Sequence, residues 1–129
     1  MRTFLLKRYG SLFYTTGTIK GKNDIVSCKL LIDTGSTYTI LPWELLYNIG
    51  ADPTLSTERV QIITASGYVL APKVRVEWIH SLGTQFELFP VVCYTLPTSF
   101  YIDGILGMDF LKKAKIHIHI FEGKITIND

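Results

Sequence analysis

The sequence predicts a mainly β protein with one or two short helices, and three observations support this fold class. Its 129 residues are 47% apolar, which suffices for the modest core of a single domain over residues 1–129. Most apolar residues fall in short runs, rich in β-branched and aromatic side chains, that end at glycine, proline or polar residues. Within one run Val74, Val76 and Trp78 alternate with Arg75, Glu77 and Ile79, as a half-exposed strand requires.

The N-terminal half predicts a hairpin followed by a short helix. Residues 12–19 and 25–32 are β-type runs on either side of a polar loop at 20–24. Residues 42–50 begin with a proline suited to the first helical position and end with a glycine, which predicts a helix. A polar loop follows at 51–57.

The C-terminal half predicts a long hairpin, a second helix and a final hairpin. Residues 59–64 and 68–79 form two β-type runs joined by the small residues Ala65, Ser66 and Gly67. The elements expected after them are a turn at 80–83, a strand at 85–94, a loop at 97–101, a short helix at 108–113, and a hairpin of residues 115–121 and 124–127 across Glu122-Gly123.

An acidic turn, Asp33-Thr34-Gly35-Ser36, interrupts the apolar sequence between residues 31 and 41. Burying a carboxylate is costly unless it is fully hydrogen-bonded or shares a proton, so its presence here suggests that the acid has a chemical role. An ordinary turn between two strands explains the same residues equally well. The motif alone leaves both interpretations open.

A second motif, Ile105-Leu106-Gly107, places a glycine after two branched apolar residues and before a helix-like segment. Together with the motif that begins at Asp33, it resembles the retropepsin-like aspartic proteases, the single-lobed relatives of the pepsins. The resemblance runs from about Thr16 to the C-terminus, and it leaves residues 1–14 outside the recognised core. The sequence Gly-Met-Asp-Phe-Leu that starts at Gly107 is typical of cellular and prokaryotic members.

The resemblance implies a closed β-barrel of the acid protease type with a flap hairpin. Thr64, Ala65, Ser66 and Gly67 occupy the flap tip, where small residues permit close approach to a bound peptide and backbone freedom. The strand that contains Gly107 is expected beside the acidic turn, with the glycine allowing two backbones to approach.

The sequence contains one Asp-Thr-Gly, without an internal repeat, whereas aspartic proteases use two carboxylates. The second carboxylate must then come from a second copy of the chain, so we expect a two-fold homodimer with its site on the axis. Retroviral members intermesh their N- and C-terminal strands at this contact. The polar end of this chain leaves that arrangement open.

The resemblance assigns a role to each residue of the acidic turn. Asp33 from each chain is expected to hold and activate a water molecule that attacks the peptide bond. Thr34 resembles the residue whose hydroxyl crosses the axis to the other subunit, and Gly35 offers its carbonyl to substrate. Ser36 is expected to donate to the carboxylate of Asp33 and favour its charged form, with an acidic pH optimum.

Retroviral enzymes place an acid two residues after the Asp-Thr-Gly and an arginine after the later glycine, and these two residues form an ion pair. Here Thr37 and Met108 stand at those positions, so both partners are absent together. Asp109 is expected to begin a helix or to brace the loop.

The leading hypothesis is therefore a dimeric aspartic endopeptidase acting on an extended peptide or protein substrate. Ile40, Ile62, Ile63 and Leu106 are expected to line its pockets and to favour apolar residues around the cleaved bond. The alternative is a catalytically weak or inactive peptide-binding or assembly module with the same fold. A simple structural β-domain explains neither motif.

Composition argues against several other functions. The net charge is +2, and the lysine groups at 20–22 and 112–115 lack interleaved aromatic residues, so we expect no nucleic-acid partner. No apolar run approaches the roughly 18 residues that span a bilayer, and the N-terminus does not resemble a secretory signal.

The remaining metal-binding residue types do not form a ligand pattern. Cys28 and Cys93 lack metal-like spacing and are expected as reduced, buried thiols of a cytoplasmic protein. His117 and His119 lie on one face of a strand, but no neighbouring ligands complete a site. We therefore expect no metal and no cofactor. A further hypothesis places these histidines near the subunit contact, where they make assembly pH-sensitive.

Overall fold

The computed structural model describes residues 1–97 and 101–128, which form eleven strands and three short helices. The helices are α1 (Trp43–Asn48), the 3-10 helix η1 (Pro53–Leu55) and α2 (Met108–Lys113). The strands are β1 (Arg2–Leu5), β2 (Lys7–Tyr9), β3 (Leu12–Lys20), β4 (Ile25–Ile32), β5 (Ile40–Leu41), β6 (Glu58–Thr64), β7 (Gly67–Ser81), β8 (Thr84–Cys93), β9 (Gly104–Leu106), β10 (Ile116–His119) and β11 (Lys124–Ile127).

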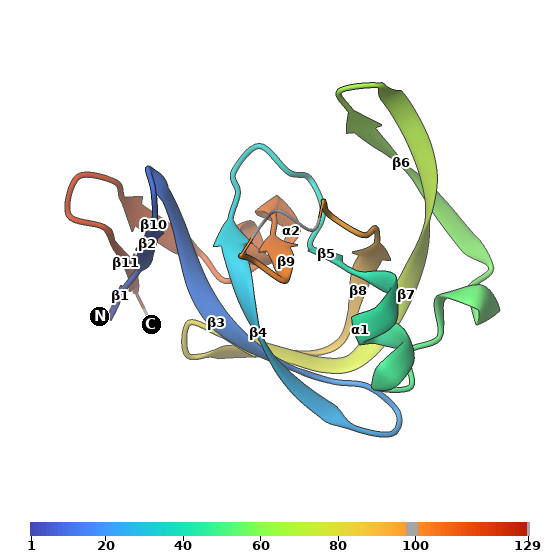
Figure 1. Cartoon of the computed structure of the whole chain (residues 1–129). Helices are drawn as coiled ribbons and strands as arrows, with labels where there is room; N and C mark the ends of the chain where they lie inside the picture. Colours follow the sequence, from blue (N-terminus) through green and yellow to red (C-terminus); the bar gives the residue numbers. More distant parts are fainter. Residues whose placement is uncertain (98–100, 129) are drawn as a thin grey trace.

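Six strands form a barrel (Figure 1). Hydrogen-bonded pairing follows the order β3-β4-β9-β5-β8-β7, and a further pairing of β3 with β7 joins the two ends of this series. The closing contact pairs Gly17–Lys20 with Trp78–Ser81 in antiparallel register. The mainly β fold class is confirmed, and this circuit of pairings closes the barrel. Beyond it, β6 and the first half of β7 extend as a hairpin, the flap.

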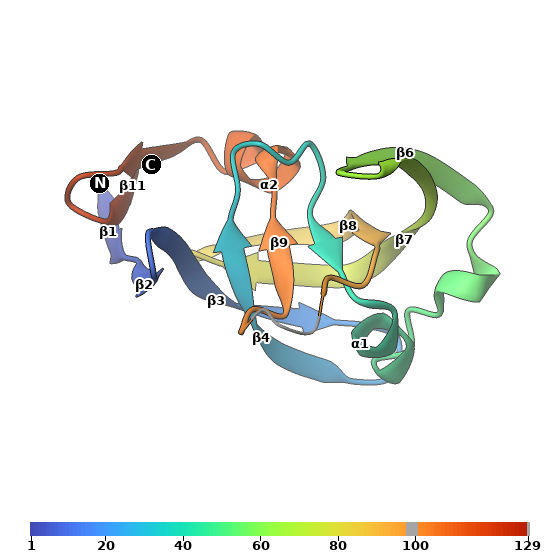
Figure 2. The same ribbon diagram turned by 45° about the horizontal axis from the view of Figure 1, so that its top comes forward.

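Strand β9 lies between the two strands that carry the acidic motif (Figure 2). It pairs parallel with β4 and antiparallel with β5, and residues 33–39, the acidic loop, arch over its end. Gly104 makes this approach feasible, because a Cβ there would lie 2.5 Å from the carbonyl oxygen of Ile40. The strand therefore lies beside the acidic motif, as the sequence predicted.

The second sheet has the order β1-β11-β10 and lies at one end of the barrel (Figure 1). Its middle strand, β11, pairs antiparallel with β1 on one side and β10 on the other. Leu6 is buried, and its N–H donates to the carbonyl of Gly123 at 2.9 Å. Residues 2–9, which lie outside the stretch that carries the family resemblance, therefore form strands β1 and β2. The sequence analysis did not predict β1, because its partner lies more than a hundred residues away and leaves little local signal.

The two predicted helices are present, with one difference at the start of α1. Pro42 caps α1 in an extended conformation, with ψ 155°, and does not occupy the first helical position that was expected. Gly50 follows the helix with φ +87°, a conformation that glycine adopts without strain. Both residues still bound the helix as predicted.

Other differences concern the ends of elements. Strand β7 continues to Ser81, so the turn expected at 80–83 is shorter, because the buried Ser81 hydroxyl donates to the carbonyl of Thr16 at 3.0 Å. Strand β10 ends at His119, two residues before the predicted end. The loop predicted at 51–57 contains η1. Part of the loop predicted at 97–101 lies outside the described residues.

The main core fills the barrel and anchors α2 to it. Phe110 is fully buried, and its ring meets those of Phe86 and Phe89 edge-to-face at centroid distances of 5.2 and 5.9 Å. Burial of one such side chain contributes roughly 1.5–3 kcal/mol, and edge-to-face geometry adds to it. This aromatic anchor positions the first turn of α2 under the acidic loop.

Strand β7 changes which of its two faces points into the core part-way along its length. Val74 and Val76 are buried and Arg75 is exposed, as the alternation predicted. The prediction was wrong for Ile79, which was expected on the face of Arg75 and Glu77 but is fully buried. Opposite this change, Leu88 has φ +49° and is 60% exposed. A residue in the left-handed region reorients the strand, so one half of β7 serves the flap and the other closes the barrel.

We predict that Leu88→Gly leaves the free energy of unfolding unchanged or raises it by up to about 1 kcal/mol. Glycine removes the left-handed strain of leucine, roughly 1 kcal/mol or more, and loses roughly 0.5–1 kcal/mol through chain entropy. The matched control is Glu77→Gly on the facing strand, also exposed but with ordinary backbone, which should lose roughly 0.5–1 kcal/mol in urea unfolding. Equal losses in both variants would contradict the role given to Leu88.

Candidate functional site

The acidic loop starts where β4 ends, and its first residues are held by backbone hydrogen bonds. The N–H of Asp33 donates to the carbonyl of Leu106 at 3.2 Å, which ties the loop to β9. The N–H of Gly35 donates to the Asp33 carboxylate at 2.9 Å, and that of Ser36 donates to the Asp33 carbonyl at 3.2 Å. The half-buried carboxylate is thus oriented by its own turn.

The start of α2 holds the far side of the acidic loop. The N–H of Met108 donates to the carbonyl of Ser36 at 2.8 Å, and the N–H of Asp109 donates to that of Thr37 at 3.2 Å. Gly107 permits this contact, because a Cβ on it would lie 2.3 Å from the carbonyl oxygen of Tyr38. The glycine of the second motif therefore allows the two backbones to meet under the loop.

A buried network of side-chain hydrogen bonds completes the support. The carboxylate of Asp109 accepts from the hydroxyl of Thr39 at 2.7 Å, from its N–H at 3.0 Å, and from the N–H of Phe110 at 2.7 Å. The Thr39 hydroxyl in turn accepts from the N–H of Gly107 at 3.2 Å. Thr39 is fully buried, so these groups depend on one another for partners. Asp109 braces the loop, as the sequence predicted.

The expected hydrogen bond from Ser36 to Asp33 is wrong. The Ser36 hydroxyl donates to the carbonyl of Tyr38 at 2.7 Å, and its single proton cannot serve a second acceptor. The turn of residues 36–38 places that carbonyl within hydrogen-bond distance of the hydroxyl. Ser36 therefore supports the shape of the loop without touching the acid, and the expected influence on the charge of Asp33 has no basis in this geometry.

A groove of ≈ 330 Å³, the flap groove, lies between the acidic loop and the flap. Its lining combines five aliphatic side chains with neutral polar and tyrosine side chains, and Asp33 is the one acid among the lining residues. The lining residues are Asp33, Gly35, Ser36, Thr37, Tyr38, Ile40, Gln61, Ile62, Ile63, Thr64, Tyr94, Leu96 and Ile105.

Not all of the predicted site residues reach the flap groove. Thr64 lines it, whereas Ala65, Ser66 and Gly67 form the exposed tip of the flap beyond it. Leu106 was expected in a pocket, but it is fully buried in the core, because the side chains of β9 alternate and Ile105 takes the outward position. Ile40, Ile62 and Ile63 line the groove as expected.

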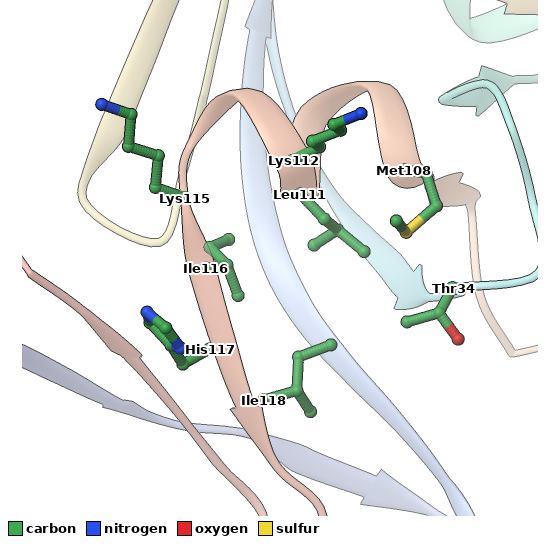
Figure 3. Close-up of a pocket in the computed structure, with 8 residues that line it drawn as sticks. All are labelled: Thr34, Met108, Leu111, Lys112, Lys115, Ile116, His117 and Ile118. Atoms are coloured by element: carbon green, nitrogen blue, oxygen red, sulfur yellow. The ribbon is translucent and has the colours of Figure 1, made fainter.

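Thr34 belongs to a different groove, of ≈ 490 Å³, which we call the α2–β10 groove (Figure 3). Its lining residues are Thr34, Met108, Leu111, Lys112, Lys115, Ile116, His117 and Ile118. The exposed Thr34 and the half-buried Asp33 are adjacent in sequence but face separate grooves. The acidic loop therefore forms a wall between the two.

Comparison with known proteins agrees with the arrangement of these elements. The model of the aspartyl protease family matches residues 15–110, a stretch that contains both the acidic loop and the β9–α2 segment. The chain belongs to the aspartyl protease family. No curated protein matches the sequence closely enough to count as a relative.

Solved structures with the same fold come from cells and from viruses. A retropepsin-like aspartic protease from Rickettsia conorii has a TM-score of 0.71 at 22% identity, with 96% of this chain and 88% of that chain covered. The retroviral protease-like domain of Ddi1 from Leishmania major has a TM-score of 0.61 at 18% identity, with 92% of this chain and 89% of that chain covered. The EIAV protease in complex with the inhibitor HBY-793 has a TM-score of 0.58 at 20% identity, with 82% of this chain and 90% of that chain covered. The retropepsin-like fold of this family member is thus confirmed.

Several groove residues of this family member were missed by the sequence analysis. Tyr94 and Leu96 follow the end of β8, and Tyr38 lies inside the acidic loop, where no periodic pattern assigns a side chain to a face. Gln61 is two residues from Ile63 on β6, so the period of a strand could have identified it.

The cysteines and histidines show no arrangement for catalysis. Burial, with a smaller contribution from Asp103, raises the pKa of the Cys28 thiol to about 12, so it stays protonated. The ring of His119 is hydrogen-bonded to the hydroxyl of Thr126 at 2.8 Å. Over residues 1–97 and 101–128, no three His, Cys, Asp or Glu side chains are grouped to hold a metal, and no helix could cross a membrane.

We predict that Thr39→Val lowers the free energy of unfolding by roughly 1–3 kcal/mol in urea, because it leaves Gly107 N–H and one Asp109 oxygen without their buried partner. Valine keeps the shape of threonine, so the loss reports the hydroxyl. Thr16→Val, at an exposed strand position, should change stability by no more than about 0.5 kcal/mol. If Thr39→Val is as stable as the control, the hydrogen bonds of the Thr39 hydroxyl do not stabilise the fold.

Proposed function

We propose that this protein is an aspartic endopeptidase that acts as a homodimer, with Asp33 of each chain holding the attacking water. The observation that carries the proposal is the acidic loop itself: one oriented carboxylate per chain, which lines a groove between the loop and the flap. Membership of the aspartyl protease family supports the reaction class. The need for two acids supports the dimer.

The chemistry requires a pair of carboxylates because water is a weak nucleophile and an amide nitrogen a poor leaving group. Two carboxylates a few ångströms apart cannot both ionise easily, so they share one proton. The pair then offers a base and an acid at one place. A single Asp33 offers only one of these at a time.

The proposed reaction has two steps. The ionised Asp33 removes a proton from the water as its oxygen bonds to the peptide carbonyl carbon, while the protonated Asp33 gives its proton to the carbonyl oxygen. The resulting tetrahedral diol collapses, the C–N bond breaks, and the nitrogen leaves with a proton returned by the pair. The products are a free carboxyl group and a free amine.

The flap groove suits an extended peptide. Strand β6 ends the sheet order, so its outer edge can pair with a substrate backbone as an added strand. The tip residues Ala65, Ser66 and Gly67 are small and exposed, as a flap that closes over the peptide requires. In the same proposal Gly35 presents its carbonyl to the substrate, and Thr34 contacts the second subunit.

The proposal places the protein in the cytoplasm and treats residues 1–129 as one functional domain. Cys28 and Cys93 support this location, because both are unpaired, buried thiols. Their burial also removes them from competing roles as nucleophiles.

We predict that Asp33→Asn abolishes hydrolysis of unfolded casein between pH 3 and pH 7, with a loss of at least about a thousandfold in kcat/KM. Activity of the unmodified protein should peak at acidic pH and decline as the shared proton is lost at higher pH. A pepstatin-type inhibitor should suppress it. Dimerisation should be followed by sedimentation in parallel.

Two results would contradict the proposal. One is hydrolysis that persists in Asp33→Asn. The other is an unmodified protein that binds peptides in the flap groove, retains this binding after Asp33→Asn, and shows no turnover at any pH. The second result would favour the alternative, a peptide-binding or assembly module with the protease fold.

We predict a preference for apolar residues on both sides of the cleaved bond. The flap groove is lined by the apolar side chains of Ile40, Ile62, Ile63, Leu96 and Ile105, which gain from contact with apolar substrate groups. Mass spectrometry of a digested peptide library measures this preference. Cleavage sites rich in charged residues next to the bond would argue against the groove as the substrate site.

A further inference from the structure

The small sheet has two outer edges, one on β10 and one on β1. Both edges of β11 are already paired within the same chain, since Arg2–Leu5 occupy one and Ile116–His119 the other. Among the described strands, neither β10 nor β1 pairs with any strand but β11. A further strand can therefore join this sheet at β10 or at β1, but not between the terminal strands.

The two edges differ in what lies beside them. The α2–β10 groove runs along β10, and the side chains of Met108, Leu111 and Ile118 converge on it together with Thr34 (Figure 3). Met108 is 38% exposed at the first position of α2. An unpaired strand edge next to an apolar groove offers both backbone hydrogen bonds and apolar contact to a partner.

The groove borders the acidic loop on the side opposite the flap groove. Thr34 forms part of its wall, while the neighbouring Asp33 lines the flap groove. A chain seated in the α2–β10 groove therefore contacts the loop that carries the acid. The β1 edge lies two strands farther from this loop.

We infer that the second copy of this chain docks here, with its β10 antiparallel to β10 and its apolar side chains in the α2–β10 groove. This inference rests on the proposed homodimer and specifies its contact. The joined sheet would have the order β1-β11-β10 followed by β10-β11-β1 of the partner. A two-fold axis through this pairing makes the interface isologous, with the same surface of each chain in contact, as a closed dimer requires. It needs no exchange of terminal strands.

The lysines that line the groove affect the strength of this contact. Lys115 extends away from the apolar side chains in Figure 3, and Lys112 and Lys115 are both exposed, so their ammonium groups can remain hydrated at the rim. A two-fold contact nevertheless brings like charges near one another. Added salt should therefore strengthen the dimer, because screening weakens this repulsion more than it affects apolar contact.

Cysteine cross-linking tests the pairing directly. His117→Cys places a thiol on the exposed side of β10, and Thr3→Cys places one at the exposed β1 edge of the same sheet. Neighbouring strands lie about 4.8 Å apart, so thiols at 117 would be adjacent across the axis, whereas those at 3 would be about five strand spacings apart, roughly 24 Å. The buried Cys28 and Cys93 keep the background low.

Oxidation and a short bis-maleimide should cross-link His117→Cys into a dimer that retains hydrolysis, and should leave Thr3→Cys uncross-linked. An active dimer that cross-links at Thr3→Cys, or at neither position, overturns the β10 contact but leaves the proposed enzyme intact. A protein that remains monomeric by sedimentation at all concentrations overturns both.

A second pair of variants tests the groove. Met108→Lys introduces a charge into it and should raise the dimer dissociation constant by at least about tenfold. Leu55→Lys, at a residue that is 79% exposed on η1 and absent from both grooves, should leave the constant unchanged. Equal constants for the two variants would overturn the inference.

Discussion

The hydrogen bonds between the first turn of α2 and the acidic loop are the interaction on which the rest of the site depends. Phe110 anchors the helix in the core, and Asp109 next to it binds Thr39 in the returning arm of the loop. The partly buried carboxylate of Asp109 accepts from three donors, and loss of any of them weakens its hold on the loop. The position of Asp33 is therefore tied to the packing of the barrel.

The acidic loop separates two grooves with different chemistry. The flap groove presents one carboxylate among aliphatic and neutral polar side chains, whereas the α2–β10 groove is lined by Thr34 and two lysines together with apolar side chains. Adjacent residues point to opposite sides because a tight turn reverses the side-chain direction over one step. In the proposed dimer, substrate binding and subunit contact use the two faces of the one short loop that carries Asp33.

Much of the fold and part of the site could be predicted from local patterns. Alternation and turn residues identified most strands, the flap hairpin and both helices, since these depend on neighbours within a few residues. The Asp33 motif and Gly107 indicated the family, because a buried acid and a close backbone approach each demand a particular residue type. For Asp109 the sequence left two roles open, a helix start and a brace for the loop, and its hydrogen bonds to Thr39 show that it braces the loop.

Contacts between distant segments were beyond such patterns. Strand β1 gains its partner from the far end of the chain, Ser36 donates to Tyr38 instead of the acid, and Leu106 faces the core instead of the groove. The residue types of the sequence establish which chemistry is available, because side-chain groups are local properties. Which groups share a groove depends on barrel closure and strand register, and these come from pairings across the whole chain that no short stretch encodes.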